Sequence, residues 1–90
     1  MEKLKHTPGK WVAKDGQIYP ESTGKTLGLI PYFDKGNEEQ VANAMLMAAA
    51  PELLHALMAI VESYNVRIED PRRKHFDAAR DAIAEAIRIE

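Results

Sequence analysis

The chain has 90 residues and a mass of 10.1 kDa, which suffices for one small domain but not for two independent cores. Apolar residues make up 46% of it and charged residues 29%, a composition typical of globular proteins rather than disordered or membrane proteins. The net charge of −2 and the pI near 5.9 exclude the basic field that nonspecific nucleic-acid binding requires, so we expect no nucleic-acid partner.

No uninterrupted apolar run approaches the roughly 20 residues of a membrane span, and the start MEKLKHTPGK has no stretch typical of a signal peptide. We therefore expect a cytoplasmic protein with no membrane partner. Because the chain has no cysteine, disulfides, thiolate zinc sites and thiol nucleophiles are excluded. Stability must come from packing, within one subunit or between subunits.

Three short strands are predicted in the first 36 residues, where aromatic and β-branched residues alternate with turn signals. Asp15-Gly16 can adopt the positive φ of a tight hairpin turn, and Ser22-Thr23-Gly24 provides a second, longer turn. These turns predict an antiparallel meander with strands at residues 11–14, 17–21 and 25–33.

The third predicted strand should contribute two leucines to the core. Leu27 and Leu29 lie two residues apart, so in an extended strand they share one face. We expect that face to pack inward together with Trp11 and Ile18.

Three helices are predicted for the remainder. Asn37 and Gln40 have the spacing of a helix cap, and the next start signals are Pro51 and Asp70-Pro71. Pro51 is expected to end a short first helix and to open the second. The predicted class is α+β, in the order βββααα: a three-stranded meander, a short helix and a two-helix hairpin. One domain is expected over 1–90, with a β region at 1–36 and a helical region at 37–90.

The first two predicted helices carry apolar residues on more than one face, which is more than a small sheet can cover. A homo-oligomer with a helical interface would bury the excess, and the alternative is that the third helix covers it. Met45, Met47 and Met58 lie in this region and are interpreted as core residues that fill gaps.

Charge is distributed unevenly along the chain. Residues 37–70 carry one basic and six acidic groups, a balance of −5, whereas Arg72, Arg73 and Lys74 form a basic cluster at a helix start. Two guanidinium groups beside free backbone amides can bind phosphate or carboxylate. Alternatively, the arginines pair with nearby acids at 69, 70 and 77 on a solvated surface.

The segment His6–Trp11 is a turn that leads directly to the only tryptophan. It could close over a ligand, or it could anchor the N-terminal segment with Trp11 against the core and with His6 or Thr7 bonded to a helix end. Asn43 is the single polar residue in the apolar run 41–50. If it is buried, its amide needs a partner, either the N-terminal turn or a ligand.

Catalytic and metal motifs are missing from the sequence. His6, His55 and His75 do not have the spacing of a helical metal pair, and the chain contains no phosphate loop or nucleophile elbow. We expect no metal, no cofactor and no enzymatic activity.

Two segments resemble a group of small proteins encoded by phages and prophages. The group's usual pattern is HTPGPW near the start and NAxLIAAAPELLxAL in the middle, and this chain has HTPGKW at residues 6–11 and NAMLMAAAPELLHAL at residues 43–57. It departs at Lys10, where the group has proline, and at Met47, where it has isoleucine. Members mostly carry no assigned activity, so the resemblance implies a phage origin and an accessory role in the host cell.

The function we predict is a non-catalytic, anti-defence phage accessory protein. It would sequester a small anionic ligand, such as a cyclic nucleotide, as an oligomer. The predicted ligand-binding residues are Arg72, Arg73, Lys74, Trp11, Asn43 and His6. The alternative is a protein that inhibits a host defence enzyme by docking through its apolar helix faces.

Overall fold

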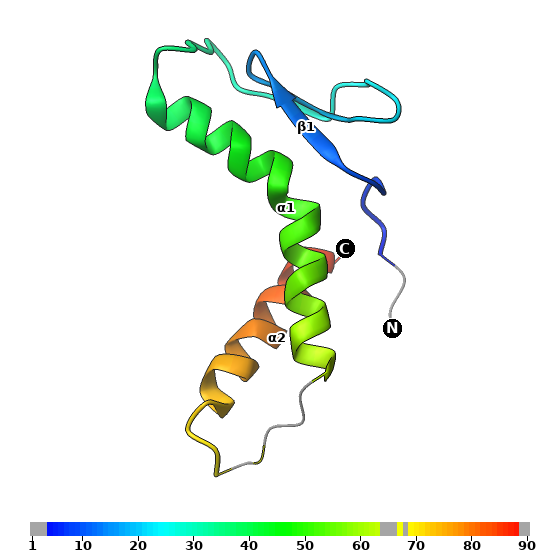
Figure 1. Ribbon diagram of the computed structural model, residues 1–90, viewed down its shortest axis with the longest axis vertical. Coiled ribbons are helices and arrows are strands. Elements are labelled where there is room, and N and C mark those ends of the chain that lie inside the picture. The colour runs from blue at the N-terminus through cyan, green and yellow to red at the C-terminus, as the bar shows by residue number, and fades with distance from the viewer. Residues whose placement is uncertain (1–3, 64–66, 68, 89–90) are drawn as a thin grey trace. The chain divides into compact units, whose positions relative to one another are not determined.

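The computed structural model describes residues 4–63, 67 and 69–88, and it has α+β architecture (Figure 1). Three strands form one antiparallel sheet in the order β1-β2-β3, and two helices follow along the chain. The strands are β1 (Trp11–Lys14), β2 (Gln17–Pro20) and β3 (Gly28–Leu29); the helices are α1 (Glu38–Ser63) and α2 (Arg73–Ile87). The α+β class is therefore confirmed, whereas the described order is βββαα.

The chain forms two compact units, which are described separately. One comprises Thr7–Glu52, which includes the sheet and the first half of α1. The other comprises Met1–His6 and Leu53–Glu90, which include the second half of α1 and α2. The expectation of a single domain over 1–90 stays a prediction.

The β1–β2 hairpin turns at the predicted dipeptide. Asp15 and Gly16 have φ values of 51° and 78°, the positive pair that a two-residue hairpin needs. A Cβ atom placed on Gly16 would lie 2.5 Å from two side-chain atoms of Phe33. Glycine is therefore required here both by the backbone angle and by the neighbouring phenylalanine.

The expected inward position of Leu27 and Leu29 is wrong. Ile18 is 3% exposed and pairs across the sheet with Gly28, whereas Leu29 pairs with Gln17. Because paired residues share a face, Gly28 lies on the buried side and Leu29 on the other. Leu27 and Leu29 are accordingly 43% and 63% exposed.

The third strand is also shorter than predicted, covering two residues instead of 25–33. Pro31 has no N–H with which to continue the ladder, and Tyr32 has a φ of 53°, so the extended backbone ends there. Beside β3, the Leu27 N–H donates to the Ile18 carbonyl at 2.7 Å and the Ile30 N–H donates to the Gly16 carbonyl at 2.7 Å.

Helix α1 begins at the predicted cap. The Asn37 Oδ1 accepts a hydrogen bond from the Gln40 N–H at 3.1 Å. The Gln40 side chain faces the preceding loop, where its Oε1 accepts the Asp34 N–H at 2.7 Å. The cap therefore ties the start of the helix to the loop that follows the sheet.

Pro51 does not divide α1, which contradicts the expected short helix. The structure has one helix of 26 residues with Pro51 inside it and buried. A proline there removes the hydrogen bond that its N–H would have donated to the Met47 carbonyl, and its ring crowds that carbonyl. The remaining bonds of a long helix and the burial of the ring outweigh that local loss.

Burial along α1 corrects the interpretation of its methionines. Met58 is 6% exposed and belongs to the core with Val61, but Met45 and Met47 are 64% and 49% exposed. Tyr64, an apolar residue near the end of the second predicted helix, lies outside the described residues. Helix α2 follows, as the Asp70-Pro71 signal predicted.

Candidate functional site

A basic pocket lies in the unit that contains α2. It has a volume of about 210 Å³ and is lined by Lys5, His6, Ala86, Ile87 and Arg88. The N-terminal segment contributes the first two residues, and the end of α2 with the residue after it contributes the rest. Alanine and isoleucine form an apolar wall, and the other three side chains supply basic nitrogen atoms.

A second histidine lies beside this pocket. The His6 and His55 rings have centroids 5.9 Å apart and are inclined at 45°. His55 is exposed on the second half of α1. The fold thus brings together side chains from positions 5, 6, 55 and 88 of the sequence.

The pocket is electrostatically suited to an anion. None of its described lining residues is acidic. The Arg88 Nη2 lies 3.1 Å from the Glu85 Oε1 in an exposed ion pair. Exposed pairs of this kind contribute little free energy. At about 210 Å³ the pocket holds an anionic group with a small body, since pockets for drug-sized ligands span roughly 300–1,000 Å³.

The arginine cluster at the start of α2 is arranged differently. Arg72 holds Asp70 through two side-chain contacts, from Nε to Oδ1 at 3.1 Å and from Nη2 to Oδ2 at 2.8 Å. The Arg72 N–H also donates to the Asp70 Oδ1 at 2.8 Å. Hydrogen bonding to the Arg72 side chain, then to its backbone, lowers the pKa of Asp70 to about 2.

Arg73 has the same preference for an intramolecular acid. The Arg73 Nε lies 3.6 Å from the Asp77 Oδ2, while Lys74 is exposed. The ion pairs given above as the alternative to a phosphate site are therefore present for both arginines. A ligand anion at this cluster would have to displace carboxylates or bind to Lys74 and the remaining donors.

Trp11 and Asn43 belong to the compact unit Thr7–Glu52. The basic pocket and the arginine cluster belong to the other unit. The Trp11 Nε1 donates to the Thr7 carbonyl at 3.0 Å, which closes the N-terminal turn on itself. Asn43 is exposed on α1, so burial does not oblige its amide to find a partner. Their assignment as ligand-binding residues stays a prediction.

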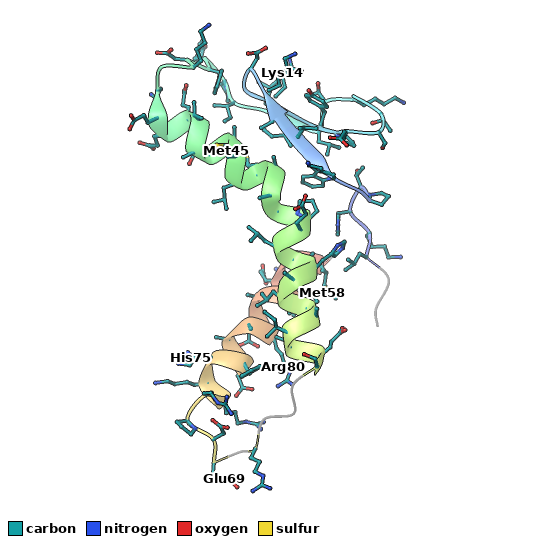
Figure 2. All side chains as sticks on the ribbon, in the orientation of Figure 1. Lys14, Met45, Met58, Glu69, His75 and Arg80 are labelled. Atoms are coloured by element: carbon teal, nitrogen blue, oxygen red, sulfur yellow. The ribbon has the colours of Figure 1, made fainter. Side chains whose placement is uncertain are left out.

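An apolar cavity of about 210 Å³ lies between α1 and α2 in the same unit as the basic pocket. Met58 and Arg80, both labelled in Figure 2, contribute to it from the two helices. Its lining is Met58, Val61, Glu62, Arg80, Ile83, Ala84 and Ile87. The cavity has too few polar groups to orient a ligand, and its buried members Met58 and Val61 identify it as part of the local core.

Helix α1 also presents large apolar side chains to solvent. Those more than two-fifths exposed are Met45, Leu46, Met47, Leu53 and Ile60. By length and composition α1 could cross a membrane, since an 18-residue window has a mean hydropathy of 1.8 and only 22% of that window is buried. An uninterrupted apolar run does not reveal this property, because Asn43, Glu52 and His55 interrupt the apolar residues of α1.

Within residues 4–63, 67 and 69–88, no group of three or more His, Cys, Asp or Glu side chains could hold a metal ion. Of the residues that line the basic pocket, only His6 is among the predicted ligand-binding residues. Lys5, His55 and Arg88 carry no local motif, and their proximity depends on how the N-terminal segment lies against the helices. Only the recurrence of basic residues near both chain ends could have suggested it.

Comparison with known proteins gives one family. The family described as Salmonella phage P22 protein Y8K6 matches residues 1–88. No curated protein and no solved structure matches the chain.

Proposed function

The chain belongs to the family of Salmonella phage P22 protein Y8K6, and from that premise we propose that it is a non-catalytic accessory protein that binds a small anionic ligand in the host cell. The ligand class we propose is a phosphate-bearing signal of host defence, such as a cyclic nucleotide. The protein would sequester this signal as a homo-oligomer and so counter the defence.

The observation that carries this proposal is the basic pocket, because three basic side chains line one small cavity that has no acidic residue in its described lining. Lys5 and Arg88 would bind the anionic group, Arg88 with the paired donors that suit phosphate oxygens. His6 would add a hydrogen bond. The apolar wall of Ala86 and Ile87 would contact the body of the ligand.

Isothermal titration against a panel of cyclic nucleotides and mononucleotides tests this function. Submicromolar binding of one member supports it, and absence of binding across the panel would contradict it. Lys5→Gln and Arg88→Gln should each weaken binding by roughly 10-fold to 100-fold, the usual effect of losing a charged hydrogen bond. A ligand recovered intact after heat release from the protein would support sequestration rather than hydrolysis.

Lys74→Gln is the matched control, because it removes one exposed basic side chain outside the pocket. It should change the dissociation constant less than about twofold if the pocket is the site. If Lys74→Gln abolishes binding while Lys5→Gln does not, the ligand binds at Arg72, Arg73 and Lys74 instead.

The second candidate function is inhibition of a host defence enzyme by direct docking, and the exposed apolar side chains of α1 favour it. The two functions differ in which variants fail. A docking inhibitor should lose its anti-defence activity with Leu46→Glu and keep it with Lys5→Gln, whereas a sequestering protein should lose it with Lys5→Gln.

A further inference from the structure

The apolar cavity between α1 and α2 lies next to the basic pocket, because one residue lines both. Ile87 contributes to the basic pocket and also to the apolar cavity. All the lining residues belong to the compact unit that contains the second half of α1 and α2. Each cavity has a volume of about 210 Å³, so together they reach the range of roughly 300–1,000 Å³ in which ligand pockets fall.

Two charged side chains stand among the apolar ones in the cavity between the helices. Glu62, near the end of α1, and Arg80, on α2, both line it and are exposed. The other lining residues are aliphatic or carry a thioether: Met58, Val61, Ile83, Ala84 and Ile87. One carboxylate and one guanidinium do not orient a ligand by themselves. A ligand that is already fixed by its phosphate in the basic pocket needs only such a pair to select the group that enters the cavity.

We propose that the ligand is a guanine nucleotide, with its phosphate in the basic pocket and its base in the cavity between α1 and α2. This inference rests on the proposed function, which places the phosphate. It deepens that function by naming the base and the two residues that read it, Glu62 and Arg80.

The walls of the cavity suit a planar base. Met58 and Val61 are 6% and 7% exposed, so packing already holds this wall in place. Aliphatic side chains contact the faces of a base, and a methionine sulfur makes favourable contacts with aromatic rings. The base therefore has apolar surface for its faces and charged groups for its edges.

The two charged groups together favour guanine. An ionised carboxylate only accepts hydrogen bonds, and guanine places two donors side by side, at N1 and N2. Adenine and cytosine place an acceptor beside their amino group, which a carboxylate repels. Guanine also offers two acceptors, O6 and N7, to which a guanidinium donates. Glu62 can thus bind one edge of guanine while Arg80 binds the other.

The contact that Arg80 makes within its own helix leaves it able to donate. Its Nη1 lies 3.7 Å from the Asp77 Oδ1, which is longer than a hydrogen bond, and both side chains are about half exposed. An alkyl phosphate would also fill both cavities, but its chain would make no use of Glu62 or Arg80. The charged pair therefore favours a base over an alkyl chain.

Isothermal titration against mononucleotides tests the base. Guanosine monophosphate should bind at least about tenfold more tightly than the adenosine, cytidine and uridine monophosphates. Inosine monophosphate, which lacks the N2 amino group, should bind more weakly than guanosine monophosphate. Equal affinity for all the bases, preference for another base, or hexyl phosphate that binds as tightly as guanosine monophosphate would overturn the proposal.

Glu62→Gln should weaken the binding of guanosine monophosphate about tenfold and leave that of inorganic phosphate unchanged. Glu69→Gln is the matched control, because it makes the same change at an exposed carboxylate outside the described lining of both cavities. Ala84→Leu should also weaken the nucleotide and not phosphate, since the larger side chain occupies the cavity. Circular dichroism should show unchanged helix content, because Glu62 and Ala84 are exposed. If Glu62→Gln keeps the full preference for guanine, the assignment is wrong.

The two halves of the ligand separate this proposal from the proposed function. Guanosine, which has no phosphate, should be weakened by Glu62→Gln and not by Lys5→Gln, and inorganic phosphate should show the reverse in NMR titrations. Nucleotides that bind without a preference for guanine would contradict the base assignment alone. If phosphate and every nucleotide fail to bind while guanosine binds through Glu62, the phosphate site is contradicted and the base site is supported.

Discussion

Helix α1 has two sets of residues, each a column at seven-residue spacing along one face, and the two columns have opposite environments. Ala44, Pro51 and Met58 are buried, whereas Leu46, Leu53 and Ile60 are more than half exposed. Since the exposed column is the more apolar of the two, hydrophobicity alone does not decide which face the chain covers. Burial depends on where the rest of the chain packs. The exposed column of Leu46, Leu53 and Ile60 is available to a partner.

The same contrast accounts for the membrane-like hydropathy of α1. A helix that is apolar on two opposite faces has a high mean hydropathy and little amphipathic character. In this chain one of the faces belongs to the fold. The other is exposed to solvent.

Truncation on the two sides of α1 should have the largest effect. Met58→Ala should lower the free energy of unfolding by about 2–5 kcal/mol, because it leaves a cavity beside Val61. Leu53→Ala should cost less than about 1 kcal/mol in dilute monomer, since its side chain is already 54% exposed. Urea denaturation at low protein concentration measures both, and equal losses would break the comparison.

Two glycines in the sheet region allow the same comparison between a position with a packed neighbour and a position without one. Gly16 and Gly24 both have positive φ, but only Gly16 has a neighbour, Phe33, in the space of a new Cβ. Gly16→Ala should therefore cost about 2–3 kcal/mol, and Gly24→Ala about 1 kcal/mol from backbone strain alone. Thermal unfolding of the pair measures the difference. If Gly24→Ala is the more damaging, the Phe33 contact does not hold the turn.

Two asparagines on or before α1 provide a smaller test. Asn37→Ala should cost about 1 kcal/mol, because it removes the cap on the Gln40 N–H. Asn43→Ala is the matched control: Asn43 is exposed within the helix, where alanine is the better helix former, so stability should hold or rise slightly. A loss on Asn43→Ala comparable to that of Asn37→Ala would show that its amide has a structural partner.

The smallest effect concerns the ion pair before α2. Arg72→Ala should raise the pKa of Asp70 from about 2 toward its ordinary value near 3.9, as carbon-detected NMR titration would show. Because folding lowers this pKa, the stabilisation exists above the unfolded value and is lost as the pH falls through about 2. Lys74→Ala should leave the Asp70 pKa unchanged. A pKa that stays near 2 in Arg72→Ala would assign the shift to another group.

Local chemistry predicted much of the fold. The Asp15-Gly16 turn, the first two strands, the Asn37 cap and the last helix all depend on residues close together in the sequence. The errors concern long-range choices. Nothing local reveals that Gly28, rather than a leucine, faces Ile18, or that Pro51 continues a helix.

The candidate site shows the same limit. His6 was anticipated from its unusual turn, but Lys5, His55 and Arg88 join it only through the packing of distant segments. The surplus apolar surface was anticipated from composition. Its location on α1 depends on which residues the rest of the chain buries.

The most direct test is the rate at which a thiol reagent modifies Leu53→Cys, measured at increasing protein concentration. Ala78→Cys, on the exposed surface of α2, is the reference. If Leu46, Leu53 and Ile60 lie in the interface of the proposed homo-oligomer, the rate at position 53 falls with concentration while that at position 78 stays constant. A rate at position 53 that is the same in dilute and concentrated protein would contradict the account.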